Sequence, residues 1–550
     1  MPWTDAADIA AKLTDALSRY DWSEAETLVF GVISRRRLEG APFPETEARR
    51  MLRELRGKRR FRLMDKLAES FQLGGLRTPQ IRRQLAQSLI EQARYEAAEQ
   101  ALDSLITELT QAGAPTNELT EARGLMGRLF KQLYINPLDG RPKGGEGYLP
   151  LALQAYSQAY AGDPRANFWP GINLCALLAW AGRHNVTVSG YPAANALARD
   201  VLTALEQLEL DAVSAPPAWQ IASTMESLIA LNRAAEAFQR AREYVQSKDA
   251  DAFELGSTLR QLTEVWELPA GNGIVTLLRA MLLHQEGGDV TFPTTNLREE
   301  QNAIAALTAD ASLQAALGDD RFKTLGWYKL GLTRADSVGR IETKSTQSPF
   351  GTGWLVKARD FNPNWPDEIL LVTNKHVISP RVNGQRYQAP LAQTPSLLPE
   401  EAIVNLQQFN VRLDIEPKEV WTSPDTDLDA TFVRMKGLPE KALPLEIDTI
   451  SVTINRPPDR VYIMGHPAGM DLQISLQDNL MIDCNPGFIQ YRAPTLGGSS
   501  GSPVFDAKNW RVIALHHGGG KQWRKLDGSG KHEANEGIAI FALIAATQST

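Results

Sequence analysis

The spacing of hydrophobic residues divides the chain into contrasting regions. Over residues 1–270, apolar positions, mostly alanine and leucine, recur at helical spacing with short polar breaks, which is typical of successive amphipathic helices. From Ser337 onward, short runs rich in β-branched and aromatic residues alternate with Gly, Pro and Asn, which is typical of strands and turns. Residues 271–335 stay mostly helical. The pattern therefore predicts a helical domain over 1–270, a helical connector over 271–335 and an all-β domain over 336–550.

A weak internal repeat runs through the helical region. The segment ARYEAAEQAL from Ala93 matches NRAAEAFQRA from Asn232 and, more loosely, RYDWSEAETL from Arg19. In each, a small or aromatic residue at a helix–helix turn precedes alanines that let a second helix pack closely. The pattern resembles the tetratricopeptide repeat, whose antiparallel helix pairs stack into a concave solenoid. The resemblance implies an α-solenoid over 1–270; a non-repetitive helical domain is the alternative.

A second motif in the helical region is RANFWPGINLCALL, with Phe168, Trp169, Gly171 and Asn173. It resembles the "YWPGIN" signature of the helical domain in apoptosis-signal-regulating kinases and some bacterial proteins. In the kinases that domain is regulatory and binds partners, so the resemblance implies an array that binds a regulatory protein. The alternative is that Trp169 and Ile172 are core residues at the start of a helix.

Composition bears on the compartment in which the chain works. With 550 residues, of which 43% are apolar and 22% charged, it is a soluble globular protein of two or three domains. Only Cys175 and Cys484 are present, far apart, which favours a reducing compartment. The amino terminus has no signal-peptide pattern, and the apolar run INLCALLAWAG from Ile172 is too short to cross a bilayer. We therefore expect a cytoplasmic protein without membrane contact.

Charge argues against a general affinity for polyanions. The net charge of −7 does not favour wholesale binding to nucleic acid or an anionic membrane. One stretch, ARRMLRELRGKRRFRLMDK from Ala48, is strongly basic and is able to hold a phosphate backbone. Its Met51, Leu52, Leu55 and Leu63 stand at core-like spacing, however, which favours a solvated helix face. Nucleic acid is the less favoured interpretation of this stretch.

A serine in a glycine-rich turn is the candidate nucleophile. Serine hydrolysis needs this hydroxyl, an imidazole to take its proton, an acid to orient the imidazole, and amides aimed at the oxyanion. The segment GGSSGSPVF (497–505) places Ser500 in such a turn before a strand. Gly498 and Gly501 let the backbone bend so that the amides of Gly498 and Ser500 form an oxyanion hole. A flexible linker is the alternative for GGSSGS, but the strands that follow argue against it.

The base and the acid precede this serine in the sequence. TNKHVI puts His376 just after the apolar strand EILLV, where a histidine can face a cleft; a partly buried structural histidine is the alternative. DTDLDATFVRM offers two acids. Asp429 is favoured because strand-forming residues follow it directly, and Asp427 is interpreted as a turn residue. The order His376, Asp429, Ser500 and the spacings suit two small barrels with the site between them.

Residues 337 to about 545 resemble the chymotrypsin-like serine proteases. GTGWLV resembles the family's first-barrel strand, TNKHVI its histidine motif, and VYIMGHPAG the strand and turn that open the second barrel. GGSSGSPVF resembles the nucleophile motif, and NEGIAIFALI the last strand and the start of the terminal helix. The resemblance implies a double β-barrel. Ser499 stands where secreted trypsins carry aspartate, so activation through a freed amino terminus is not implied.

The residues before the nucleophile point away from trypsin specificity. The position that is acidic in trypsins is Pro494 here, so cleavage after Lys or Arg is not indicated. The stretch is similar to glutamyl endopeptidases, which carry a threonine before the glycines and a histidine in the pocket-lining strand, matched by Thr495 and His516. The similarity implies that these two bind a substrate carboxylate or amide. No ligand spacing completes a metal site with His516 and His517, and no cofactor is expected.

These features together predict a regulated cytosolic serine endopeptidase. The helical array is expected to bind a protein partner or another trigger, and the barrel domain to cut a protein substrate. The combination of a sensor array and a protease is similar to bacterial stress or antiphage effectors, a likeness of architecture alone. The alternative is a scaffold in which the array and a catalytically silent protease domain mediate protein–protein interaction. The intact set of His376, Asp429, Ser500 and Gly498 argues against that alternative.

Overall fold

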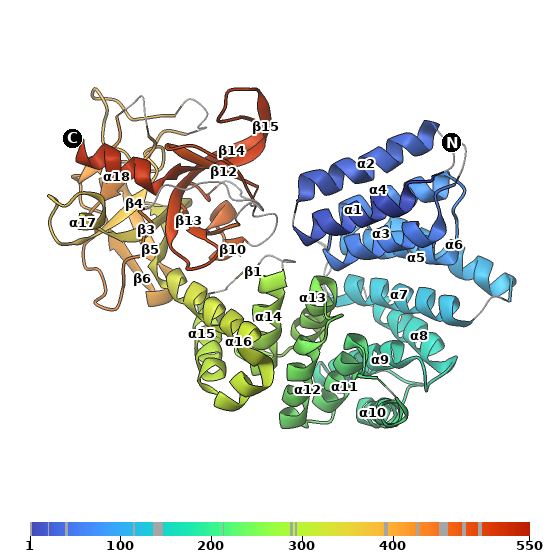
Figure 1. The fold of residues 1–550 in the computed structure, drawn as a ribbon. Helices are drawn as coiled ribbons and strands as arrows, with labels where there is room; N and C mark the ends of the chain where they lie inside the picture. Colours follow the sequence, from blue (N-terminus) through green and yellow to red (C-terminus); the bar gives the residue numbers. More distant parts are fainter. Residues whose placement is uncertain are drawn as a thin grey trace. The chain divides into compact units, whose positions relative to one another are not determined.

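The computed structural model divides the chain into two compact units (Figure 1). The described residues are 3–19, 21–38, 42–113, 116–135, 147–212, 214–285, 290–291, 294–389, 394–424, 428–449, 460–475, 480–492 and 498–549. The helical unit comprises Met1–Gly287 with Ala315–Leu317, and the β unit comprises Gly288–Gln314 with Gly318–Thr550. No helix in the described ranges combines the length and the apolar character that a membrane crossing needs.

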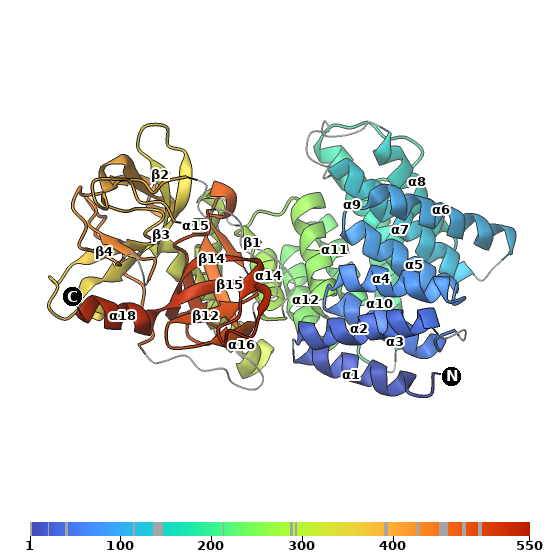
Figure 2. The ribbon, with the colours of Figure 1, turned by 90° about the horizontal axis from the view of Figure 1, so that it is seen from above.

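The helical unit is an array of helices in which most consecutive helices pack side by side, while α1 also packs on α3, α2 on α4 and α12 on α14 (Figures 1 and 2). Its elements are α1 (Ala6–Ser18), α2 (Trp22–Leu38), α3 (Glu45–Gly57), α4 (Phe61–Leu73), α5 (Pro79–Glu91), α6 (Tyr95–Gln111), α7 (Thr116–Ile135), α8 (Tyr148–Ala161), α9 (Phe168–Arg183), α10 (Ala194–Asp211), α11 (Ala218–Ala230), α12 (Ala234–Gln246), α13 (Ala252–Arg260), the π-helical turn η1 (Gln261–Val265) and α14 (Gly273–Gln285). This arrangement is the tetratricopeptide-like array that the repeat predicts.

The internal repeat has a counterpart in backbone geometry. Ala93, between α5 and α6, and Asn232, between α11 and α12, both take a left-handed conformation with φ of 56°. The next amides, of Arg94 and Arg233, each donate over 2.9 Å to the carbonyl five residues earlier. This hydrogen bond closes the first helix of a pair and turns the chain into the second. The two segments that match in sequence therefore form the same helix–helix turn.

The basic stretch from Ala48 forms α3 and the start of α4. Met51, Leu52, Leu55 and Leu63 are buried in the core of the helical unit. The basic side chains of the stretch are therefore carried on helices whose apolar faces are already packed.

The β unit begins with an edge strand and two helices. β1 (Val290–Thr291) pairs antiparallel with β10 (Gln473–Ser475), and the helices α15 (Thr294–Ala309) and α16 (Ala311–Arg334) follow. Trp327 of α16 donates its indole N–H to the carbonyl of Ala507 over 2.9 Å, and its ring lies 4.9 Å from that of Trp510. The end of the expected connector is thus packed on the β unit.

Two curled antiparallel sheets form the body of the β unit (Figure 2). The first has the order β6-β5-β2-β3-β4-β8-β7 in the described residues. Its strands are β2 (Val338–Thr343), β3 (Pro349–Lys357), β4 (Ile369–Thr373), β5 (Ala402–Leu406), β6 (Val411–Asp414), β7 (Trp421–Thr422) and β8 (Thr431–Val433). Ile341, Leu355, Leu371, Val404 and Val433 from five of these strands meet in its core.

The second sheet has the order β1-β10-β9-β13-β14-β15-β12-β11 in the described residues. Its remaining strands are β9 (Val461–Gly465), β11 (Met481–Cys484), β12 (Phe488–Tyr491), β13 (Pro503–Asp506), β14 (Val512–Arg524) and β15 (Lys531–Ala539). The chain then enters α18 (Ile540–Gln548), as the motif NEGIAIFALI predicts. The carbonyl of Thr547 in α18 accepts a hydrogen bond from Asn362, at the end of α17 (Ala358–Phe361), over 2.6 Å. Two curled sheets and a terminal helix agree with the predicted chymotrypsin-like fold.

Candidate active site

The turn that carries His376 is held by buried polar residues. It follows β4, whose apolar residues are buried in the first sheet. Asn374 donates its amide to the carbonyl of Asp429 over 2.8 Å, and the ammonium group of the buried Lys375 donates to the carbonyl of Ser423 over 2.8 Å. The side chain of His376, in contrast, is only half-buried. The strand end and the two anchors leave the imidazole little freedom of position.

Asp429 uses both of its carboxylate oxygens on His376. Its Oδ2 lies 2.5 Å from the ring Nδ1, and its Oδ1 accepts the backbone N–H of His376 over 2.9 Å. Burial opposes the charge, but the hydrogen bonds from His376 and His517 hold the pKa of Asp429 well below its usual range. The acid is therefore ionised and orients the ring so that Nε2 is left for another partner. Asp427, the alternative acid, lies outside the described residues.

The turn around Ser500 is fixed by close backbone contacts. Gly498 and Gly501 have φ of 93° and 86°, which favour glycine. A Cβ on Gly501 would lie 2.0 Å from the carbonyl oxygen of Thr352 and 2.5 Å from the hydroxyl of Thr373. Within this turn Ser500 is half-buried. Glycine at 501 is therefore required both by conformation and by space.

The same turn is hydrogen-bonded to strands on either side. Thr352 of β3 donates its amide to the carbonyl of Ser500 and its hydroxyl to the carbonyl of Gly498, each over 2.9 Å. On the other side, Gly501 donates its amide to the carbonyl of His516 over 2.9 Å. The candidate nucleophile is thus held between β3 and β14.

The turns of Ser500 and His376 meet at Gly351. A Cβ on this residue of β3 would lie 2.7 Å from Cγ1 of Val377 and 3.3 Å from the carbonyl oxygen of Ser500. Val377 follows His376 directly, so the two turns approach one another over a strand position without a side chain. The fold therefore pairs His376 with Asp429 and places the turn of Ser500 next to the turn that carries His376.

The candidate oxyanion amides are described in part. The carbonyl of Ser499 accepts the amide of Ser502 over 3.0 Å. Because a trans peptide directs its C=O and N–H to opposite sides, the N–H of Ser500 faces away from this bond. The peptide that carries the N–H of Gly498 begins at Gly497, which lies outside the described residues.

His516, the candidate specificity residue, is a buried and neutral imidazole. Its Nδ1 lies 2.7 Å from the hydroxyl of Tyr491, a fully buried residue of β12. Burial lowers the pKa of His516 to about 3, with smaller contributions from the positive charges of His517 and His376. The ring therefore offers one donor and one acceptor. Thr495, its predicted partner, and Pro494 lie outside the described residues.

His517 contacts the candidate triad from the other side, which the sequence did not predict. Its Nδ1 lies 3.8 Å from Oδ2 of Asp429, and its Nε2 lies 3.0 Å from Oε1 of Glu536. Burial disfavours the charged ring, but these two carboxylates raise the pKa of His517 to about 9. His517 is therefore an imidazolium between two acids at neutral pH.

Glu536 continues this chain of contacts across the second sheet. Its other oxygen accepts the side-chain amide of Gln490 over 2.6 Å, and the amide oxygen of Gln490 lies 2.7 Å from Nε2 of His532. Gln490 is on β12, whereas Glu536 and His532 are on β15. The adjacent histidines 516 and 517 were visible in the sequence, but the acid opposite them follows from strand pairing. The same pairing explains why the ring of His516 is neutral and that of His517 is charged.

Two family models match the chain, one in the helical unit and one in the β unit. The family model described as a trypsin-like peptidase domain matches residues 351–515, and the one described as Tetratricopeptide Repeats-Sensor matches residues 58–178. The C-terminal part of the chain therefore contains a trypsin-like peptidase domain, and the N-terminal part contains a tetratricopeptide-like repeat region.

Two curated relatives match part of the chain. Secreted RxLR effector protein 73 of Plasmopara viticola is 29% identical over 231 residues, which are 39% of this chain and 53% of that protein. Uncharacterized protein y4fB of Sinorhizobium fredii is 27% identical over 236 residues, which are 39% of this chain and 32% of that protein. The chain thus spans about half of one relative and about a third of the other.

Solved structures that are similar to parts of the chain include a tetratricopeptide repeat protein and a protease. A thermophilic tetratricopeptide repeat protein from Thermus thermophilus is 16% identical with a TM-score of 0.29, and covers 40% of this chain and 99% of its own. The tobacco vein mottling virus protease is 14% identical with a TM-score of 0.22, and covers 38% of this chain and 78% of its own.

Proposed function

We propose that the trypsin-like peptidase domain of this chain is an active serine endopeptidase. Ser500 is the nucleophile, His376 the general base and acid, and Asp429 the residue that orients the imidazole. The amides of Gly498 and Ser500 stabilise the oxyanion. One observation carries the proposal. Nδ1 of His376 lies 2.5 Å from one carboxylate oxygen of Asp429, and the backbone N–H of His376 donates to the other over 2.9 Å, next to the hydrogen-bonded turn of Ser500.

The chemistry follows from these roles. Nε2 of His376 takes the proton of the Ser500 hydroxyl while Oγ attacks the carbonyl carbon of the scissile peptide. The amides of Gly498 and Ser500 bind the resulting oxyanion. His376 then gives its proton to the leaving amine, and the C–N bond breaks to leave an acyl ester on Ser500. A water molecule, deprotonated by the same imidazole, hydrolyses the ester and restores the hydroxyl.

We assign His517 to the positioning of the acid. An imidazolium 3.8 Å from Oδ2 of Asp429 keeps that carboxylate ionised, and Glu536 in turn holds the imidazolium. Alternating charges at short range support one another in a poorly solvated site. His517 thus acts on the reaction through Asp429 and touches no reacting atom.

The pocket proposal rests on the neutrality of His516. We assign the Tyr491 hydroxyl as the donor to Nδ1; the proton of the neutral ring then stands on Nε2, which can donate to a substrate side chain. A neutral donor binds a carboxamide oxygen without the charge partner that a carboxylate requires. We therefore propose a polar side chain before the scissile bond, held by His516 and Thr495, with Gln favoured over Glu.

A peptide series tests this preference directly. Matched substrates that differ only in Gln, Glu, Asn, Lys or Phe before the scissile bond are compared by kcat/KM. The Gln peptide is expected to be cleaved fastest, and Tyr491→Phe is expected to narrow its advantage over Glu because Nδ1 loses its donor. Faster cleavage after Lys or Phe would contradict the assignment.

We further propose that the helical unit controls the peptidase. Repeat arrays of this class mediate protein–protein interaction, and a protease in a cytosol needs restraint. Within the proposal, a protein partner or another trigger bound by the array permits cleavage of a chosen protein substrate, in the manner of a bacterial stress or defence effector. A scaffold with a silent protease domain is the alternative, and it predicts that a cellular phenotype survives Ser500→Ala.

The test of the function is a proteome-wide profile of new amino termini made by the full chain. The wild type is compared with Ser500→Ala, which removes one oxygen from a half-buried side chain. Termini that are present with the wild type and absent with the variant are expected, and they share a residue type before the cut. Identical profiles from the two proteins would refute the proposal.

A further inference from the structure

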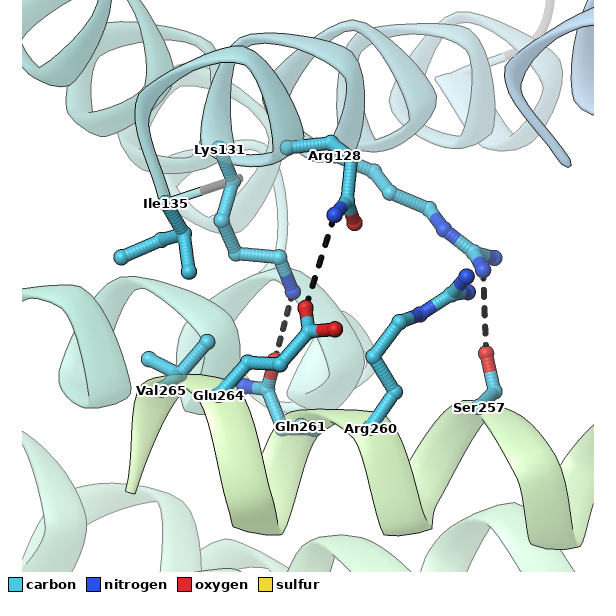
Figure 3. A pocket seen from close by; sticks show the side chains of 9 residues that line it. Arg128, Lys131, Ile135, Ser257, Arg260, Gln261, Glu264 and Val265 are labelled. Carbon is cyan, nitrogen blue, oxygen red and sulfur yellow. Dashed lines mark hydrogen bonds between the residues drawn. The ribbon is translucent and has the colours of Figure 1, made fainter. Parts of the chain in front are cut away.

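The helical unit contains a pocket between α7 and the α13–η1 segment (Figure 3). The pocket is a shallow opening, and its volume of about 300 Å³ includes open solvent. The lining residues are Arg128, Lys131, Gln132 and Ile135 from α7, and Ser257, Arg260, Gln261, Glu264 and Val265 from the opposite segment. Figure 3 shows Lys131 and Arg128 projecting from α7 toward the side chains of that segment.

One wall of the pocket is a π-helical turn. α13 ends at Arg260, and Gln261–Val265 continues with the wider spacing in which the amide of Trp266 donates to the carbonyl of Gln261 over 3.1 Å. Such turns are rare within α-helical segments and are frequent at functional sites. This one places Gln261, Glu264 and Val265 together on the pocket.

Lys131 is buried in this pocket, and within the described ranges its hydrogen-bond acceptors include no carboxylate. Its ammonium group donates to Oδ1 of Asn173 over 2.7 Å and to Oε1 of Gln261 over 2.6 Å, and both acceptors are neutral amides. The side-chain amide of Asn173 donates in turn to the carbonyl of Trp169 over 2.9 Å, which fixes its oxygen toward Lys131. Asn173 and Trp169 belong to the motif RANFWPGINLCALL. The motif therefore supplies one of the two hydrogen-bond acceptors of a buried cation.

Among the side chains that line the pocket, three are basic and one is acidic. Arg128 pairs with the buried Glu91 and donates to the hydroxyl of Ser257 over 3.1 Å. Arg260, which is more exposed, also reaches Glu91 over 3.3 Å. Of the side chains that line the pocket, Glu264 carries the one carboxylate, and it accepts the amide of Gln132 over 3.4 Å.

The charged and titratable groups around Lys131 come from several helices. Burial, with smaller contributions from the positive charges of Arg128 and Arg260, lowers the pKa of Lys131 to about 7, and Glu226 on α11 and Glu264 on η1 oppose this shift. Burial also raises the pKa of Glu226, which accepts the indole N–H of Trp266 over 2.8 Å. The ring of Tyr156 on α8 lies 5.9 Å from the ammonium group.

We propose that this pocket binds a small molecule through a phosphate or similar oxyanion group. Arg128, Lys131 and Arg260 supply N–H donors to one space, and Ser257 and Gln132 add neutral donors. Several donors around one point match the oxygens of a tetrahedral dianion better than a single carboxylate. Glu264 is the one carboxylate among the lining side chains, and its negative charge competes with the ligand for the cations.

The inference stands apart from the proteolysis proposed above, because it concerns binding to the helical unit alone. Binding of an anion in this pocket is also expected to be coupled to the uptake of a proton. An anion beside Lys131 favours the charged ammonium, so binding takes up a proton near neutral pH and weakens as pH rises above 7. Sulfate keeps a constant charge over this range, so it separates this uptake from titration of the ligand.

The experiment is calorimetric titration of the full chain carrying Ser500→Ala, so that self-cleavage plays no part. The probes are sulfate, inorganic phosphate and a nucleoside monophosphate, each up to millimolar concentration; the last two separate a free anion from a phosphate ester. Saturable binding of at least one probe is expected. Binding enthalpies of sulfate in buffers of different ionisation enthalpy report the proton uptake.

Three variants decide whether the pocket is responsible. Lys131→Gln is expected to weaken binding at least about tenfold, the scale of one charge-assisted hydrogen bond. Glu264→Gln removes the competing charge and is expected to tighten binding severalfold, a gain that misfolding does not produce. Lys12→Gln, an exposed residue of α1, is the matched control and is expected to leave binding unchanged.

The outcomes are distinct. If Lys131→Gln does not fold, Arg260→Gln at the more exposed edge of the pocket replaces it with the same expected direction. Absence of saturable binding for all three probes would overturn the proposal. The proposal would also be overturned if a probe binds but its affinity is the same in the Lys131 or Arg260 variant and in Glu264→Gln as in the wild type.

Discussion

The two units each bury a row of ionisable side chains, but they balance the charge differently. In the β unit, His376, Asp429, His517 and Glu536 alternate base and acid, and each carboxylate lies beside an imidazole. In the helical unit, the buried Lys131 is held by two neutral amides, and one carboxylate stands among the side chains that line its pocket. The proposed functions follow this difference, because a balanced row suits the fixed geometry of a reaction and an unbalanced one suits the binding of an anion.

The two units also use left-handed turns for different purposes. In the β unit, Gly501 is enclosed by Thr352 and Thr373, with no room for a side chain. In the helical unit, Ala93 and Asn232 adopt left-handed φ at the turns of repeated helix pairs. The first turn is fixed by its surroundings, and the second by its own hydrogen bonds.

The largest expected effect comes from removing the central acid of the balanced row. Asp429→Asn keeps the shape but presents an amide to His376, which favours the wrong tautomer, so kcat is expected to fall about 10⁴-fold. Asp367→Asn, an exposed acid in the same unit, is the control and is expected to retain full activity. Steady-state cleavage of a peptide taken from the terminus profile measures both. A loss of less than about tenfold for Asp429→Asn would break the proposed role of the acid.

The next largest effect is expected from adding a methyl group at Gly501, and it concerns the stability of the β unit. Gly501→Ala sets a methyl group against the carbonyl of Thr352 at a φ of 86°, and is expected to lower the free energy of unfolding by about 4 kcal/mol. Gly528→Ala has a similar φ of 74° with nothing nearby, so it is expected to cost only about 1 kcal/mol. Equal losses in denaturant unfolding would show that the turn is not enclosed.

The charge rows are expected to respond to pH in opposite directions. The folded pKa of His517, about 9, exceeds the unfolded value of about 6.5, so its contribution to stability falls as pH rises between them. The folded pKa of Lys131, about 7, is below the unfolded value of about 10.4, so stability rises with pH over that range.

Unfolding of the wild type, His517→Gln and Lys131→Gln across pH 7 to 9 separates these contributions. The wild-type advantage over His517→Gln is expected to shrink by about 2 kcal/mol as pH rises. The wild type is expected to gain relative to Lys131→Gln over the same range. Parallel trends for the two variants would remove the contrast between the units.

The smallest expected effect concerns the repeated helix turn. Ala93→Gly relieves a left-handed alanine and is expected to stabilise the helical unit by about 0.5 kcal/mol, the strain relieved less the entropy of glycine. Asn232→Gly should change stability little, because asparagine tolerates this conformation. Thermal unfolding of the two variants measures the difference. Destabilisation by Ala93→Gly would contradict the assigned turn geometry.

Local pattern was sufficient to predict the two architectures, and it also singles out the residues of the candidate triad. Helical spacing and a short repeat predict the array, and the histidine and serine motifs each combine a strand with a turn in one continuous segment. Asp429 was chosen over Asp427 from the strand that follows it. These features depend on neighbours in sequence, which a single chain displays directly.

The charged surroundings of the site depended on pairing between distant strands and helices. His517 stands beside His516 in the sequence, but its charge comes from Asp429, which lies just before β8, and from Glu536 on β15. Lys131 and Asn173 lie on different helices, and the π-helical turn opposite them has no sequence signal of its own. Such juxtapositions arise from tertiary packing, so periodicity and spacing could not predict them.

The most direct test of the account is labelling of the full chain with a fluorophosphonate, followed by mass spectrometry of its peptides. The reagent phosphonylates a serine whose hydroxyl is activated by a neighbouring base. A single adduct at Ser500 is expected, together with its loss in His376→Ala and its retention in Asp367→Asn. An unlabelled Ser500 in the folded wild type, or labelling that persists in His376→Ala, would contradict the central claim.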